Sequence, residues 1–325
     1  MSRLLGPASA LLSAAWLAGV SAAGETFHWK DDEQRGVADL FYGDQPVLRY
    51  MYAYDDSTAE RREETYKPYH HVFGPGSGQI ITKGPGGLYP HHRGLYVAWN
   101  KTQADGKSFD FWHCTNGVHQ RHVEFVEMTG DAKSGAMTAR IHWNDAADQP
   151  VVAETRTVAV SRPEGLDRPA WQIDWRTKLE SRRGEITLDG DRQHAGFQFR
   201  AAQVVAEEKS ARYIRPAGFP EQPQAFEVND RTDADGHVNL GWLAMTCPLA
   251  GRQYTIEYFE DPALPRPSRY SERPYGRFGA FFKTTLAPEE PLEMRYRLVV
   301  STGEPPSRRA IQRRYERFAA EVGAK

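Results

Sequence analysis

The densest group of residues capable of chemistry is the run Gly86 to Gly94 (GGLYPHHRG), which leads directly into an apolar segment, Leu95 to Asn100. Adjacent residues entering a strand point to opposite faces, so we expect His91 and Arg93 to share one face and His92 to take the other. Imidazole can act as an acid or base near neutral pH, and a neighbouring guanidinium can hold a carboxylate. The alternative for each histidine is a turn residue bonded to the backbone.

A second segment, Asp110 to His113 (DFWH), combines aromatic and polar side chains. Trp112 can stack on the apolar face of a pyranose ring while His113 bonds its hydroxyl groups. The alternative is a core tryptophan beside a surface histidine. This pattern favours a sugar cleft without excluding a core position.

Two further segments carry arginine beside histidine or tyrosine. In His194 to Arg200 (HAGFQFR), a period of two places Gln198 and Arg200 on the same face as His194, which predicts a polar, concave, wet surface. In Pro267 to Gly279, Tyr275 and Arg277 can supply a proton donor and an anion clamp. A solvated loop held by its prolines is the equal alternative there.

Metal and carboxylate sites are less well specified. A site for a divalent cation held by histidines is possible, because six histidines lie near these segments. The sequence has no HExxH, HxH or paired-cysteine spacing, however, so no cofactor is assigned. Glycosidase carboxylates are defined by separation in space rather than by spacing along the chain. The histidines are His91, His92, His113, His119, His122 and His194; the carboxylate candidates are Asp110, Glu124, Glu227 and Asp230.

Composition excludes several functional classes. The formal net charge is −2, which provides no general attraction to nucleic acid or anionic membranes. No GxSxG, P-loop or GxGxxG motif is present, which argues against an α/β-hydrolase, an NTPase and a Rossmann oxidoreductase. After the N-terminal segment, no apolar run reaches the roughly 20 residues of a membrane span.

The N-terminal segment is typical of a signal peptide. Arg3 precedes an apolar stretch, Leu11 to Val20, and the small residues that follow end at Ala23. We therefore expect a signal peptide over 1–23, a mature chain over 24–325 that forms one domain, and a periplasmic or secreted bacterial protein. In an oxidising compartment, Cys114 and Cys247 can form one disulfide or remain two buried thiols.

Alternating large residues predict most of the secondary structure. The clearest segments are 137–143, 171–179 and 292–300; further strands are expected at 47–54, 95–100, 123–128, 151–160, 197–201, 254–259 and 278–283. One amphipathic helix is expected from Ser307 to Val322, packed outside the sheets. Residues 55–94, 102–121, 216–237 and 260–277 are expected to be long loops. The fold class is therefore all-β, a large antiparallel β-sandwich with a C-terminal helix.

The segments quoted above together resemble the DUF6807 family of secreted bacterial proteins, often labelled methane oxygenase PmoA-like. The motifs that carry the resemblance are YPHHRG, FWH, HAGFQFR and YGR, and the similarity spans nearly all of the mature chain. The label implies a multi-span membrane protein, which this sequence does not fit. The resemblance implies instead a sandwich similar to the galactose-mutarotase supersandwich.

Three functional hypotheses remain, each with an oligosaccharide or polysaccharide as partner. The first is a glycan hydrolase with Trp112 as a platform. The second is a lyase in which His91 or His194 and Tyr275 move protons, while an arginine neutralises a uronate carboxylate. The third is a sugar-binding or sugar-epimerising protein that breaks no glycosidic bond. The many histidines and arginines favour catalysis. The three arginine candidates are Arg93, Arg200 and Arg277.

Overall fold

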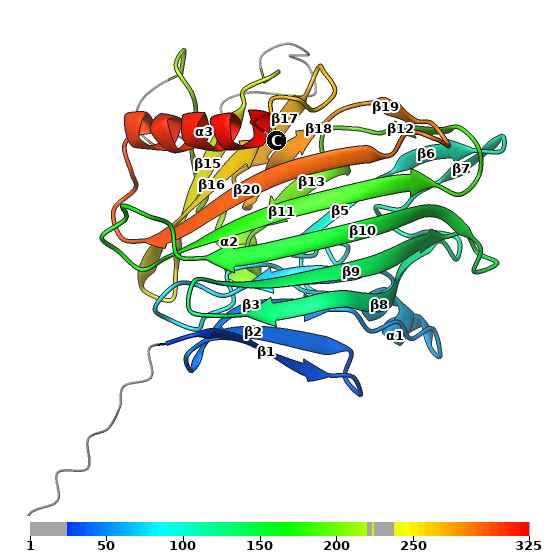
Figure 1. The fold of residues 1–325 in the computed structure, drawn as a ribbon, viewed down its shortest axis with the longest axis horizontal. Helices are drawn as coiled ribbons and strands as arrows, with labels where there is room; N and C mark the ends of the chain where they lie inside the picture. The colour runs from blue at the N-terminus through cyan, green and yellow to red at the C-terminus, as the bar shows by residue number, and fades with distance from the viewer. Residues whose placement is uncertain (1–24, 220–222, 224–236, 325) are drawn as a thin grey trace, which may run out of the picture.

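The computed structural model describes residues 25–219, 223 and 237–324. The expected signal peptide and the candidate carboxylates Glu227 and Asp230 lie outside the described residues. Within them, the strands form two eight-stranded sheets and one four-stranded sheet, and every strand pairing is antiparallel (Figure 1). This architecture confirms the all-β antiparallel sandwich expected from the sequence.

The strands follow one another in each sheet in a defined order. The first sheet is β1 (Phe27–Asp32), β2 (Val37–Tyr42), β3 (Gln45–Met51), β4 (Tyr69–Val72), β5 (Leu95–Trp99), β13 (Ala195–Arg200), β18 (Arg277–Phe281) and β17 (Arg269–Arg273). The second is β14 (Arg212–Ile214), β15 (Trp242–Leu249), β16 (Arg252–Glu260), β20 (Leu292–Thr302), β11 (Ala170–Ser181), β10 (Pro150–Ser161), β9 (Ser134–Asn144) and β8 (His119–Gly130). The small sheet is β19 (Thr284–Leu286), β12 (Ile186–Asp189), β6 (Lys101–Ala104) and β7 (Lys107–Phe109).

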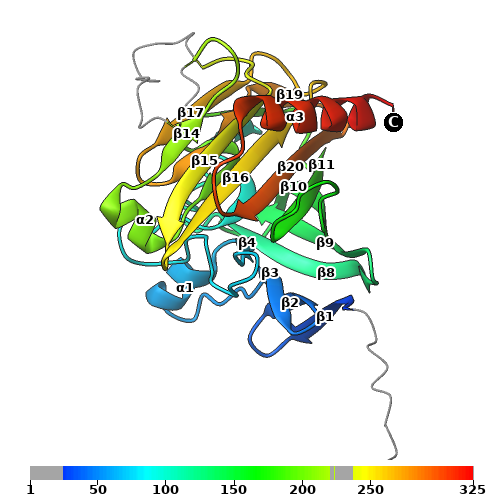
Figure 2. The same cartoon turned by 90° about the vertical axis from the view of Figure 1, so that its left-hand side faces the viewer.

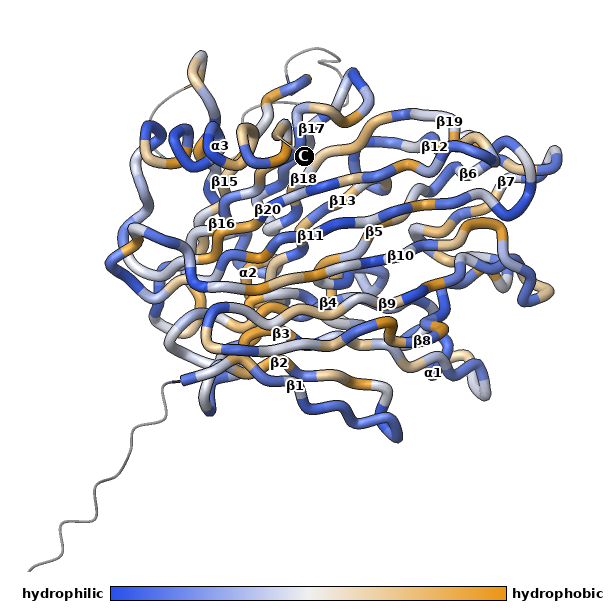
Figure 3. Tube along the Cα trace, viewed as in Figure 1, coloured by the Kyte–Doolittle hydropathy of each residue, from blue (hydrophilic) through white to orange (hydrophobic). Residues whose placement is uncertain are grey.

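Aromatic side chains from the two large sheets interlock to form the core. Phe197 of β13 lies 4.8 Å from Trp175 of β11 and 4.7 Å from Tyr296 of β20, measured between ring centroids. Trp99 of β5 lies 6.2 Å from Trp143 of β9. All five rings are almost completely buried, and apolar residues recur along the strands of both sheets (Figure 3). Such ring pairs add to the free energy gained by burying their area, which fixes the sheets face to face.

The C-terminal helix α3 (Arg308–Gly323) packs on the outside of the second sheet, as the sequence predicts. The Ser307 hydroxyl accepts a hydrogen bond from the Ala310 N–H and so caps the first turn. Ile311 and Phe318 pack in a small cluster with Trp242 and neighbouring residues of β15, β16 and β20. The turned view shows the helix lying across these strands (Figure 2).

The expectation of long loops is wrong in three places. Residues 55–94 contain the helix α1 (Ala59–Thr65) and strand β4, residues 102–121 contain β7 and parts of β6 and β8, and residues 260–277 contain β17. Apart from β8, these elements are three to seven residues long, too short to show periodicity. The stretch 216–237 falls mostly outside the described residues. A further short helix, α2 (Gln203–Glu208), follows β13.

Two other expectations concern the cysteines and the membrane. Cys114 and Cys247 are both buried and unbonded, so the structure has the two thiols rather than the disulfide. Within residues 25–219, 223 and 237–324, no helix combines the length and apolar character needed to cross a membrane.

Strand β4 carries two adjacent buried histidines, which make stability depend on pH. Burial, followed by the charges of Arg49 and Arg93, lowers the pKa of His71 to about 4, and burial holds the pKa of His70 well below its usual value. In the unfolded chain both imidazoles titrate near pH 6.5, at about the model-peptide value. The unfolded state therefore binds more protons than the folded state at pH 5, and stability falls as the pH decreases below 6.5.

We predict that lowering the pH from 7 to 5 reduces the free energy of unfolding, with His71 alone contributing about 2 kcal/mol. Urea unfolding of the wild type and of His71→Gln at both pH values measures the contribution of His71 to the free energy of unfolding. The variant should lose less stability on acidification than the wild type. Equal losses in the two proteins would contradict the assignment.

Candidate active site

Three of the predicted histidines meet at one point, although they come from three separate connections. His91 lies in the connection between β4 and β5, His113 between β7 and β8, and His194 between β12 and β13. One potential ligand nitrogen from each lies within 4.8 Å of the others, and all three side chains are half-buried. The ring centroids are 4.7 Å apart for His113 and His194, and 5.0 Å apart for His91 and His113. We call these residues the histidine trio.

Strand pairing explains how two of the trio come together. In the small sheet, Thr102 of β6 lies opposite both Phe109 of β7 and Leu188 of β12. The turns that follow β7 and β12 therefore emerge side by side. His91 is brought in by its own connection, in which the His92 N–H donates to the Tyr89 carbonyl at 2.9 Å and so forms a turn before β5. The expected shared strand face of His91 and Arg93 is thus wrong, because β5 begins only at Leu95.

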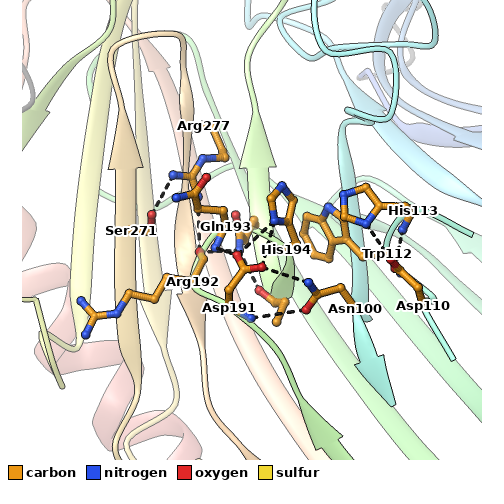
Figure 4. Close-up of polar contacts among 12 residues, drawn as sticks. Asn100, Asp110, Trp112, His113, Asp191, Arg192, Gln193, His194, Ser271 and Arg277 are labelled. Carbon is orange, nitrogen blue, oxygen red and sulfur yellow. Dashed lines mark hydrogen bonds and ion pairs between the residues drawn. The ribbon is translucent and has the colours of Figure 1, made fainter. Parts of the chain in front are cut away.

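Two members of the trio are oriented by a carboxylate three residues earlier. Asp110 Oδ2 lies 2.8 Å from His113 Nδ1, and its other oxygen accepts the N–H groups of Trp112 and His113. Asp191 Oδ1 lies 3.0 Å from His194 Nδ1, and Asp191 Oδ2 accepts a hydrogen bond of 2.9 Å from the Asn100 amide. Figure 4 shows both pairs. Because a carboxylate accepts the Nδ1 proton, each imidazole is left with its Nε2 lone pair.

The same four-residue pattern, Asp-x-x-His, therefore builds both turns. Asp191 was not among the sequence candidates, although the repeat at Asp110–His113 and Asp191–His194 can be read from the sequence. Aspartate readily bonds backbone N–H groups two or three residues ahead, which closes the turn and places its second oxygen beside the histidine. This repeat is the local signal that identifies the site.

The surroundings lower the pKa of two imidazoles of the trio. Burial lowers the pKa of His91 to about 3, assisted by the nearby His113 and Arg200. Burial also lowers the pKa of His194, although hydrogen bonding and charge from Asp191 oppose that change. For Asp110, burial would raise the carboxyl pKa, but hydrogen bonds from His113 outweigh it and the net pKa is lowered. Neutral imidazoles at His91 and His194 and an ionised carboxylate at Asp110 are thus favoured at neutral pH.

Beside the trio, His92, Tyr89 and Tyr275 form a connected group of rings. His92 is 5% exposed, and its ring lies 4.7 Å from that of His91 and 4.9 Å from that of Tyr89. Tyr89 lies 4.6 Å from Tyr275, and both tyrosines are partly exposed. Tyr275 therefore connects to the trio through His92. Tyr89, which sequence analysis did not single out, has a left-handed φ of 58°, a conformation uncommon for a residue other than glycine.

The predicted sugar platform is wrong. Trp112 is completely buried, with its ring 4.7 Å from Tyr96 and 6.3 Å from His194. The Arg200 guanidinium lies 5.1 Å from the indole centroid. Trp112 supports the turn that carries His113 but cannot stack on a substrate.

The expected wet face of β13 is also wrong. Gln198 and Arg200 do lie on the face opposite Phe197, but each is only 1% exposed because the turns of the site cover them. Arg200 donates to the Gln198 side chain at 2.7 Å and to the Gln193 carbonyl at 2.9 Å. Its strand neighbour Arg277, also 1% exposed, donates to the Ser271 hydroxyl (Figure 4). These groups form a buried polar layer beneath the trio.

An open cleft lies beside His194. Its volume is about 660 Å³, and its lining includes Asp191, Arg269 and Lys283. Lys283 forms an ion pair of 2.8 Å with Asp189 at the cleft wall. The cleft gives a ligand room to approach the exposed edge of the trio.

With this geometry established, comparison with known proteins places the chain in a family. A model described as "Family of unknown function (DUF6807)" matches residues 38–316, most of the chain. The chain belongs to the DUF6807 family. This result confirms the resemblance seen in the sequence motifs. None of the curated proteins compared is similar to the chain.

The DUF6807 chain also aligns with solved structures of low sequence identity. A protein assigned as a kojibiose phosphorylase, from the human microbiome, matches at 9% identity and a TM-score of 0.31, over 90% of this chain and 32% of its own. An α-galactosidase from Lactobacillus brevis matches at 9% identity and a TM-score of 0.37, over 86% of this chain and 38% of its own. A galactose mutarotase related enzyme from Lactobacillus acidophilus matches at 6% identity and a TM-score of 0.33, over 86% of this chain and 97% of its own. Such low TM-scores assign no activity to the DUF6807 chain.

Arg93 anchors the connection that carries His91 in this DUF6807 protein. The side chain is completely buried, and its guanidinium donates to the backbone carbonyls of Glu63, Pro90 and His92. It also lies 4.9 Å from the Tyr66 ring. These contacts show that Arg93 holds the loop in place, and its complete burial keeps it from contacting a substrate.

We predict that Arg93→Met destabilises the protein by about 2–4 kcal/mol, because three carbonyls lose a buried charged donor. Urea unfolding measures the change. Arg35→Met is the matched control: the Arg35 side chain is 70% exposed, and its replacement should change stability by less than about 0.5 kcal/mol. Wild-type stability of Arg93→Met would contradict the anchoring role.

Proposed function

We propose that this DUF6807 protein is an exported carbohydrate-active enzyme that hydrolyses a glycan or glycoside. The observation that carries the proposal is the histidine trio, whose member His194 lines an open cleft, with His113 and His194 each oriented by a carboxylate. An imidazole whose second nitrogen is held by a carboxylate is a recurrent arrangement for moving protons at a reacting centre.

Catalysis accounts for these residues better than binding alone. A sugar-binding surface needs exposed aromatic rings and hydrogen-bonding groups, but it has no need for neutral bases that converge on one point. Burial lowers the pKa of His91 to about 3 and burial also lowers that of His194, so both bases remain unprotonated at neutral pH. Groups with shifted pKa values at a cleft are typical of active sites.

The polar character of the cleft supports a sugar as substrate. Carboxylate, amide and cationic side chains surround the site, and such groups hydrogen-bond to hydroxyl-rich ligands. Tyr89 and Tyr275 replace Trp112 as the aromatic groups that can contact a ring, because both are partly exposed beside His92.

In the proposed reaction, the trio activates a water molecule whose oxygen attacks the anomeric carbon. The water proton passes to a base at the trio, the glycosidic C–O bond breaks, and the leaving oxygen takes a proton from the Tyr275 hydroxyl. Exchange with solvent then restores both groups. Asp110 and Asp191 hold the imidazoles in the orientation this transfer requires.

The lyase hypothesis loses one of its supports. Its arginine clamp requires a guanidinium that reaches the substrate, whereas Arg93, Arg200 and Arg277 are at most 1% exposed. A buried guanidinium can still act through its field, but it cannot pair directly with a uronate carboxylate. The predicted arginine clamp therefore fails, and the cationic groups that do line the cleft include Arg269 and Lys283.

We predict that His194→Asn and Tyr275→Phe lower turnover by roughly 10²–10⁴-fold, the usual contribution of a positioned acid or base. Mass spectrometry of products from neutral and uronate-containing oligosaccharides measures the reaction. His142→Asn is the control, because His142 is a half-buried histidine of β9 away from the trio.

The products decide between the hypotheses. A mass gain of one water per cleavage supports hydrolysis, whereas an unsaturated sugar would establish elimination instead. Cleavage that survives both His194→Asn and Tyr275→Phe would place the chemistry elsewhere. No product from any substrate in the panel would overturn the proposal in favour of a binding or epimerising protein.

A further inference from the structure

The histidine trio has the composition and orientation of a transition-metal site. Two nitrogens bound to one tetrahedral Zn²⁺ lie about 3.4 Å apart, since each Zn–N bond is about 2.0–2.1 Å long. The nitrogens of the trio already lie within 4.8 Å of one another. Small rotations of three half-buried rings are enough to bring them to a common ion.

The hydrogen bonds leave the correct atoms for a metal. Because Asp110 and Asp191 engage the Nδ1 atoms of His113 and His194, the Nε2 atoms remain as ligands. Metal-bound histidines commonly have their second nitrogen held by a carboxylate, which fixes the tautomer and increases the basicity of the ligand. Two such pairs meet at one point.

His91 supplies an independent observation. Its Nε2 atom is buried and has no hydrogen-bond partner among the described residues. A buried polar atom without a partner is costly, and native proteins seldom leave one without a reason. The ring lies within 6 Å of both other members of the trio, so a cation bound there would satisfy this nitrogen.

We propose that His91, His113 and His194 bind one divalent transition-metal cation such as Zn²⁺. Three imidazoles suit Zn²⁺ and its neighbours, whereas Mg²⁺ and Ca²⁺ require oxygen ligands. Three protein ligands leave the fourth position of a tetrahedral ion for water or substrate, as in catalytic zinc sites, and His194 borders the cleft. The carboxylates of Asp110 and Asp191 offset the two positive charges of the ion.

This inference deepens the proposed function. The metal site itself does not depend on the proposed hydrolase activity, but the catalytic role of the metal does. A bound cation lowers the pKa of its water to about 7, which provides a nucleophile without a free imidazole base. The three histidines then act as ligands, and the water proton leaves for solvent through the open side of the site. Tyr275 retains its role toward the leaving oxygen.

Metal binding is tested without any substrate. Tag-free protein is stripped with a chelator and titrated with Co²⁺, whose visible absorption reports tetrahedral coordination, and with Zn²⁺ by calorimetry. We expect one equivalent to bind. His113→Ala and His194→Ala should weaken affinity at least 100-fold, and Asp110→Asn and Asp191→Asn by roughly 10–100-fold.

Controls separate binding from folding. His142→Ala should bind like the wild type, and thermal unfolding should show that Asp110→Asn and Asp191→Asn remain folded. Absence of a stoichiometric site in the wild type, or unchanged affinity in the His113→Ala/His194→Ala double variant, would overturn the metal site.

The two proposals fail separately. Glycan cleavage that persists in metal-free protein would remove the catalytic role of the metal but keep the hydrolase. One tightly bound equivalent in a protein that cleaves no glycan would keep the metal site but remove the hydrolase.

Discussion

The packing of the two eight-stranded sheets against each other is the constraint on which the site depends. The inner faces are filled by rings such as Trp175 and Phe197, and the polar groups among them are paired: the buried Arg156 guanidinium lies 4.9 Å from the Trp175 ring and forms an ion pair of 2.7 Å with Glu154. The opposite face of β13 carries Gln198 and Arg200. Both side chains are covered, and they donate hydrogen bonds to the backbone carbonyls of residues 192 and 193. The turns that bear the histidine trio provide that cover, so the site forms on the outside of the first sheet.

Burial, assisted by positive charges near the trio, lowers the pKa of His91 and His194, and the same charges weaken the binding of a cation there. Burial lowers the pKa of Lys67 to about 7, and its ammonium group donates to the Trp112 carbonyl behind His113. Arg200 adds a second buried positive group, whose influence reaches His91 and His194. A divalent cation at the trio therefore depends on the negative charges of Asp110 and Asp191. This dependence makes replacement of either carboxylate by its amide a sensitive probe.

Sequence patterns predicted the parts of this structure that arise from local periodicity. Long alternating strands such as β11 and the amphipathic helix α3 were identified because their faces are buried uniformly along their length. His91, His113 and His194 were singled out from their local composition. Their meeting point was not predictable, because it follows from the pairing of β6 with β7 and β12 and from the turn that precedes β5. Trp112 was misassigned for the same reason, since burial depends on what covers a residue.

Orientation and proximity in the trio have separate physical origins. The orientation of His113 and His194 is set within four residues, by an aspartate that closes its own turn and accepts the Nδ1 proton. Their proximity is set by strand pairing over a sequence separation of about 80 residues, which the hydrogen bonds of the small sheet maintain. Losing a carboxylate therefore disorders one imidazole but leaves the three rings together. Breaking the small sheet would instead separate two correctly oriented rings, so proximity is the part of the site that requires the whole fold.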